Sequence, residues 1–198
     1  MSQYAYTCPL RITARFVGGA AVIAAALLTA ACSQPVEEAP GTVPADVETQ
    51  RQEESTDIGD VTALNIAGLE TLLAGAENKV LVINFWATWC VPCVAEMPYL
   101  AAFYQQHDRD DVVFLALSLD SPGDIDDTVT PFMHEHNIPF PAYVLTDRDI
   151  EAISKTIGQE IYGVLPTTIV YDRRGAVRKV WEGAITLDDL NGEVTPLL

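Results

Sequence analysis

Two cysteines separated by two residues, Cys90 and Cys93, are the residues of this sequence whose spacing most directly suggests chemistry. Such a pair can close into a disulfide and exchange it with other thiols and disulfides. The alternatives are half of a zinc site or two unrelated core cysteines. A zinc site needs further ligands, and the sequence contains no second pair of cysteines at this spacing. The pattern therefore favours redox chemistry.

The elements on either side of this pair predict which cysteine reacts first. An apolar, β-branched run from Val80 to Phe85 predicts a buried strand, and an amphipathic run from Val94 to His107 predicts a helix. At the start of a helix, free amide groups and the helix dipole stabilise a thiolate. We therefore expect Cys90 to be the nucleophile and Cys93 to resolve the mixed disulfide.

The residues around the pair resemble a known family. The stretch WATWCVPCVAEMP at 86–98, followed by LPTT at 165–168, resembles the TlpA/ResA-type branch of the thioredoxin-like proteins, within the redoxin (AhpC/TSA-like) superfamily. The resemblance covers residues 61–198. It implies an α/β, thioredoxin-like fold with a central mixed β-sheet flanked by helices, carrying the inserted strand and helix of that branch.

The same resemblance implies a function. Members of this branch are membrane-anchored, extracytoplasmic thiol-disulfide oxidoreductases, and several are reductants in cytochrome c maturation. The implied partners are protein disulfides, such as those of apocytochromes, and a membrane electron carrier of the CcdA/DsbD type. No cofactor, bound metal or nucleic acid is expected. Two alternatives remain: a disulfide oxidant or isomerase, and a copper-binding thioredoxin-fold chaperone, although those chaperones have three residues between their cysteines.

Further site residues follow from the resemblance. An acid is expected at Glu96, three residues after Cys93, where partial burial would raise its pKa and suit it to exchange a proton with that cysteine. The alternative is an exposed helix glutamate. The peptide bond before Pro166 is expected to be cis, and the backbone of Leu165 to pair with an extended substrate segment. Trp89 is expected to contact the partner.

Other residues near the pair have less specific interpretations. Thioredoxin has a buried acid on the strand before its cysteines, whereas this chain has Asn84 there, which leaves Glu96 as the acidic candidate. Core packing accounts for Trp86 as well as a role in the site does. Three residues are predicted to be solvated at the surface: His107, His134 and His136.

The N-terminal segment, residues 1–31, has the pattern of a signal peptide. Two arginines precede an apolar run from Phe16 to Ala31 that contains no acidic residue. This run is short for a membrane-spanning helix, which needs about 20 apolar residues. Its last residues and Cys32 resemble a bacterial lipoprotein box. We therefore predict lipidation of Cys32 and membrane anchoring on the periplasmic side, with an uncleaved N-terminal anchor as the alternative.

The next segment, residues 32–60, is predicted to be an acidic, disordered tether. Arg51 is its single basic residue, among eight acidic residues. Low hydrophobicity and charge of one sign cannot offset the entropy lost on ordering the chain. Ser33 resembles an outer-membrane sorting signal. The formal net charge of the whole chain is −17, which disfavours nucleic-acid binding and would attract a basic partner.

The remaining sequence, residues 61–198, is predicted to form one domain. Hydrophobic periodicity predicts helices near 63–76, 125–136, 149–157 and from 187 onward. It also predicts strands near 112–117, 142–145, 168–171 and 176–181, the last two joined in a hairpin.

Overall fold

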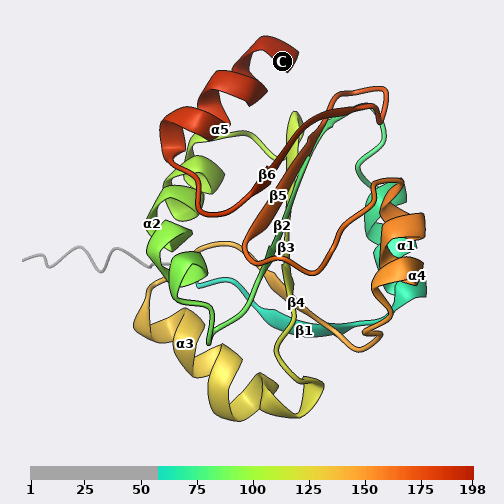
Figure 1. The fold of residues 1–198 in the computed structure, drawn as a ribbon. Coiled ribbons are helices and arrows are strands. Elements are labelled where there is room, and N and C mark those ends of the chain that lie inside the picture. Colours follow the sequence, from blue (N-terminus) through green and yellow to red (C-terminus); the bar gives the residue numbers. More distant parts are fainter. Residues whose placement is uncertain (1–57) are drawn as a thin grey trace, which may run out of the picture. The chain divides into compact units, whose positions relative to one another are not determined.

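A computed structural model of the protein describes residues 58–198. Six strands and five α-helices make up this part of the chain (Figure 1). The strands are β1 (Val61–Leu64), β2 (Val80–Trp86), β3 (Val112–Ser118), β4 (Ala142–Leu145), β5 (Thr167–Tyr171) and β6 (Val177–Glu182). The helices are α1 (Ile66–Ala74), α2 (Val91–Gln106), α3 (Thr130–Glu135), α4 (Ile150–Ile157) and α5 (Leu187–Val194). Single helical turns occupy Pro122–Asp124, Ile125–Val129 and Thr195–Leu197.

The strands form one mixed sheet in the order β1-β4-β3-β2-β5-β6. Strands β1, β4, β3 and β2 run parallel to one another, while β5 is antiparallel to both β2 and β6. Helices α2, α3 and α5 cover one face of the sheet, and α1 and α4 cover the other (Figure 1). This arrangement confirms the predicted α/β fold with a thioredoxin-like, mixed central sheet.

Strand β2 lies in the middle of the sheet, and all seven of its residues are buried. Successive side chains of a strand point to opposite faces. Val82 and Trp86 accordingly pack in the cluster under α2, whereas Ile83 and Phe85 pack in the cluster under α1 and α4. By this alternation Asn84 faces α2, the helix that follows the cysteines.

The sequence patterns placed most elements correctly, with two exceptions. Residues 63–76 were predicted as one helix, but β1 forms first, and α1 begins at Ile66. Asn65 stops the strand because its side chain caps the helix, accepting a hydrogen bond of 2.8 Å from the amide of Gly68. Helix α2 begins at Val91, three residues earlier than predicted, because Cys90 takes the capping position.

An additional helix and strand, α3 and β4, follow β3, and the resemblance implied an insertion of this kind. Strand β4 lies between β3 and the edge strand β1, and it pairs with both in parallel. Its first residue, Ala142, also donates a backbone hydrogen bond of 2.9 Å to Asp60. The insertion therefore widens the sheet on the side away from the β5–β6 hairpin.

The predicted signal peptide, Cys32 and most of the predicted tether lie outside the described residues. The first described residue, Ile58, lies just before the expected domain boundary. The amide of the next residue, Gly59, donates a hydrogen bond of 3.0 Å to the carbonyl of Ile138. Every helix within 58–198 falls short of the length or hydrophobicity that crossing a membrane requires.

Candidate active site

The cysteine pair lies where β2 gives way to α2, as the sequence predicted. Cys90 is the N-cap of α2 and Cys93 lies in its first turn, and the two form a disulfide. The amide of Cys93 donates a hydrogen bond of 3.3 Å to Sγ of Cys90. Cys90 is 6% exposed and Cys93 is completely buried. The geometry thus gives Cys90 both the helix-terminal amide and the greater access to solvent.

The residues that flank Cys90 differ sharply in exposure. Trp89 and Val91 are 67% and 79% exposed, so both present apolar surface next to the reactive sulfur. Trp86, by contrast, is completely buried, and its ring centroid lies 5.5 Å from that of Phe132. Trp86 is therefore part of the core, and Trp89 is the tryptophan that a partner protein can touch.

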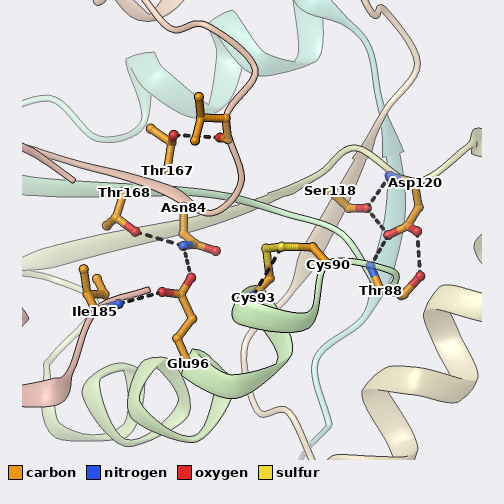
Figure 2. The surroundings of a disulfide bond; sticks show 11 residues. Asn84, Thr88, Cys90, Cys93, Glu96, Ser118, Asp120, Thr167, Thr168 and Ile185 are labelled. Carbon is orange, nitrogen blue, oxygen red and sulfur yellow. Dashed lines mark hydrogen bonds between the residues drawn. A yellow bond between two sulfur atoms is a disulfide. The ribbon is translucent and has the colours of Figure 1, made fainter. Parts of the chain in front are cut away.

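Glu96 lies one helical turn after Cys93 and is 1% exposed (Figure 2). Its Oε1 accepts a hydrogen bond of 2.8 Å from Nδ2 of Asn84, and its Oε2 accepts one of 3.0 Å from the amide of Ile185. Burial raises the pKa of Glu96 to about 7, although both hydrogen bonds act to lower the pKa. The alternative of an exposed surface glutamate is therefore wrong.

Asn84 connects Glu96 to the neighbouring strand β5 on the same face of the sheet. Its Nδ2 also donates a hydrogen bond of 2.9 Å to Oγ1 of Thr168 on β5. Its Oδ1 is buried and has no hydrogen-bond partner among the described residues. The sequence identified Asn84 only as a departure from thioredoxin. A polar residue inside an otherwise apolar strand was the signal that it serves the site.

A second buried acid, Asp120, holds the loop that leads to Cys90. It accepts hydrogen bonds of 2.9 Å from the amide of Thr88, 2.6 Å from the Thr88 hydroxyl and 2.7 Å from the Ser118 hydroxyl (Figure 2). The sequence analysis did not identify Asp120 as a site residue. Polar residues just after a buried parallel strand were the available signal, because sites form at the carboxyl ends of such strands.

The peptide bond between Leu165 and Pro166 is cis, as expected from the resemblance. Thr167, the next residue, is the register partner of Phe85 near the end of β2. The cis bond therefore lies at the same end of the sheet as the loop that carries Cys90. Pro166 is buried and Leu165 is partly exposed.

The three histidines lie away from the cysteine pair in the sequence and differ in environment. His134 and His136 are exposed, as predicted. His107 is half-buried, because its ring packs against that of Phe103 with centroids 4.4 Å apart and its Nε2 lies 3.1 Å from Oδ1 of Asn191. The prediction that His107 is a solvated surface residue was wrong.

Comparison with known proteins agrees with this geometry. The model of the AhpC/TSA family matches residues 56–180. The thiol-disulfide oxidoreductase ResA of Oceanobacillus iheyensis is 34% identical over 120 residues, which are 61% of this chain and 58% of that protein. The chain thus spans less than two thirds of that relative. ResA of Geobacillus thermodenitrificans is 32% identical over 66% of this chain and 70% of its own length.

Solved structures show the same similarity. A thioredoxin-related protein from Neisseria meningitidis serogroup B has a TM-score of 0.51 and 28% identity, over 60% of this chain and 84% of that chain. A thiol:disulfide interchange protein of the thioredoxin family from Chlorobium tepidum has a TM-score of 0.52 and 27% identity, over 63% of this chain and 83% of that chain. The chain therefore belongs to the AhpC/TSA family and is a thiol-disulfide oxidoreductase of the ResA, thioredoxin-like type, with its Cys-x-x-Cys pair at Cys90 and Cys93.

Proposed function

We propose that this protein reduces disulfide bonds in partner proteins on the extracytoplasmic side of a membrane, with apocytochromes as a fitting class of partner. Cys90 is the attacking thiolate, Cys93 is the resolving thiol, and Glu96 takes the proton of Cys93. The observation that carries this proposal is the buried carboxyl of Glu96, one turn from Cys93, with its pKa raised to about 7.

The first step uses Cys90. In the reduced protein its thiolate attacks one sulfur of the partner disulfide, the partner's S–S bond breaks, and the partner's other sulfur leaves as a thiolate that takes a proton from water. The amide of Cys93, which points at Sγ of Cys90 from 3.3 Å, stabilises the attacking thiolate. The product is a mixed disulfide between Cys90 and the partner.

The second step needs Cys93 as a thiolate. Cys93 is fully buried, and burial in apolar surroundings raises the pKa of a thiol, so it needs a base nearby. Glu96 accepts the proton, Cys93 attacks Sγ of Cys90, and the partner leaves with its second sulfur reduced. A base is most effective when its pKa lies near the working pH, and the pKa of about 7 for Glu96 meets this condition.

Two features at the end of the sheet that carries Cys90 support a protein as the substrate. Trp89 and Val91 offer exposed apolar surface beside Cys90. The backbone of Leu165 makes no hydrogen bond within residues 58–198, so its amide and carbonyl are available to pair with an extended segment of a partner. Recognition through backbone groups would tolerate many partner sequences.

The N-terminal sequence supports the extracytoplasmic location. A signal-peptide pattern ending at Cys32, followed by an acidic segment, fits a lipid-anchored domain held away from the membrane surface, on either the inner or the outer membrane. The excess of acidic residues would favour encounter with a basic partner. A membrane carrier of the CcdA/DsbD type would restore the dithiol.

The test follows the two steps separately. Reduced protein is mixed with a disulfide-bonded peptide that contains the Cys-x-x-Cys-His sequence of c-type haem attachment, and species are quantified by rapid acid quench and mass spectrometry. Glu96→Gln should slow resolution of the mixed disulfide by about 100-fold or more while the first attack proceeds at the parent rate. Glu151→Gln, an exposed glutamate on α4, is the matched control. Equal resolution rates in parent and Glu96→Gln would contradict the role of Glu96.

A further inference from the structure

The carbonyl oxygen of Asn84 is a buried acceptor that nothing in the described residues satisfies. Asn84 is completely buried, and its Nδ2 has two partners, whereas its Oδ1 has none. Buried polar atoms are nearly always hydrogen-bonded, so an exception needs an explanation. Figure 2 shows the unpartnered end of the Asn84 amide pointing toward Cys93, while the other end points toward Glu96 and Thr168.

Reduction of the disulfide creates a hydrogen-bond donor that Oδ1 of Asn84 can accept from. In the oxidised pair the sulfur of Cys93 is bonded to Cys90 and has no hydrogen to donate. In the dithiol, Cys93 carries an S–H group, which is a weak donor, and after ionisation its sulfur becomes an acceptor. The carboxyl of Glu96 undergoes the opposite change when it takes the proton.

We propose that Asn84 is a positioning residue whose side-chain amide bridges Cys93 and Glu96 and reverses its orientation when a proton passes from the thiol to the carboxylate. This inference rests on the proposed role of Glu96 as proton acceptor. An amide suits the position because it has a donor at one end and an acceptor at the other, and because rotation about its terminal torsion exchanges the two.

In each proton state both ends of the Asn84 amide have a hydrogen-bond partner. Before transfer, the thiol of Cys93 donates to Oδ1 of Asn84, and Nδ2 donates to the carboxylate of Glu96 as the structure shows. After transfer, Nδ2 donates to the thiolate of Cys93, and Oδ1 accepts the new O–H of Glu96. The proton leaves Sγ and ends on Oε1; the amide rotates and neither gains nor loses a hydrogen.

The neighbours of this bridge are compatible with both states. Thr168 has a hydroxyl, which accepts from Nδ2 before transfer and can donate to Oδ1 afterwards. The amide of Ile185, in the segment between β6 and α5, donates to Oε2 of Glu96 throughout. Within residues 58–198, no charged side chain forms a hydrogen bond or an ion pair with Glu96, so Cys93 is the titratable group that shares the bridge.

The experiment is a double-mutant cycle on the resolution step. Asn84→Ala, Glu96→Gln and the double variant are compared with the parent in the quench assay described above, from pH 5 to 9. Val82→Ala is the control, because Val82 is a buried neighbour on the same face of β2 and its truncation leaves the polar groups in place. Thr168→Val removes the hydroxyl that the bridge uses in both orientations.

We expect Asn84→Ala to slow resolution by about 10- to 100-fold, the effect of losing a hydrogen bond to a charged group, and to leave the attack by Cys90 at the parent rate. Its pH profile should change, and the double variant should be no slower than Glu96→Gln alone, because the two residues act as one unit. Thr168→Val should slow resolution less, and Val82→Ala should lower stability without changing the pH profile.

The outcomes separate this inference from the proposed function. If Glu96→Gln resolves at the parent rate, the proposed function fails and the bridge fails with it. If Glu96→Gln is slow but Asn84→Ala has the rate and pH profile of Val82→Ala, the bridge alone is overturned. Additive losses in the double variant would also overturn it, because they would show that Asn84 and Glu96 act independently.

Discussion

The side-chain amide of Asn84 on β2 donates a hydrogen bond of 2.8 Å to the carboxylate of Glu96 on α2, and both groups are buried. This contact joins the strand that leads into the cysteine pair to the helix that leads out of it. The carboxylate is thereby held beside Cys93 and away from water. The predictions below depend on this placement and on the loop that carries Cys90.

The buried carboxyl of Glu96 should make stability depend on pH. Its pKa is about 7 in the folded protein, against 4.5 for the ordinary group. Between these values the folded protein holds a proton that the unfolded chain releases, so the free energy of unfolding should fall as pH rises from about 4.5 to 7. The loss at this site is about 3 kcal/mol.

Glu96→Gln cannot ionise and should lack this dependence. The measurement is the free energy of unfolding of the oxidised protein in urea at pH 5 and pH 8, taken for parent and variant. Relative to the parent, the free energy of unfolding of Glu96→Gln should be higher at pH 8 than at pH 5. A constant difference would show that Glu96 ionises in the folded state as it does in the unfolded chain.

The two cysteines should react in a fixed order, with Cys90 first and Cys93 second. Cys90 is the more exposed and caps the helix, so Cys93→Ala should accumulate mixed disulfides between Cys90 and partner proteins. Non-reducing electrophoresis of extracts, followed by mass spectrometry, measures these adducts. Cys90→Ala is the matched variant and should give few. Adducts formed by Cys90→Ala alone would reverse the assignment of the two roles.

The sequence was sufficient to predict the reactive pair and the order of most elements. Cys90 and Cys93 form a short motif that is recognised from its spacing alone. A continuous apolar run marks β2, and apolar residues on one face mark α2. Strand β1 was missed because four residues at the sheet edge, two of them exposed, carry no strong period.

The supporting residues were harder to predict because their partners lie far away in the chain. Glu96 meets Ile185 across 89 positions, and Thr88 meets Asp120 across 32. No local pattern encodes these contacts; they exist only once the strands pair. The resemblance indicated an acid at Glu96, but the hydrogen bond from Asn84 and the network of Asp120 required the structure.

The loop before Cys90 should depend on Asp120. Asp120→Ala would leave the partly buried amide of Thr88 without its acceptor, and it would remove two hydroxyl contacts. We expect the free energy of unfolding to fall by about 2 to 4 kcal/mol. Urea unfolding measures this loss. Asp124→Ala, at an exposed position of the same segment, should stay within about 0.5 kcal/mol of the parent, and an equal loss in both variants would contradict the role of Asp120.

Membrane attachment should depend on Cys32. The apolar run that ends at this cysteine predicts a lipid anchor. Cells grown with a labelled fatty-acid precursor should label the parent protein and should not label Cys32→Ala. Cys8→Ala, which changes the other cysteine outside the domain, should be labelled as the parent is. Normal labelling of Cys32→Ala would contradict lipidation at this cysteine.

The reduction potential of the Cys90–Cys93 pair tests most directly whether the protein is a reductant. Strong oxidants stabilise their reduced form, whereas Sγ of Cys90 accepts a single hydrogen bond within residues 58–198. Equilibration with glutathione or dithiothreitol buffers, with the dithiol fraction read by mass spectrometry after alkylation, gives the potential. We predict a value near that of thioredoxin, about −270 mV. A value near that of strong oxidants, about −120 mV, would contradict a reducing role.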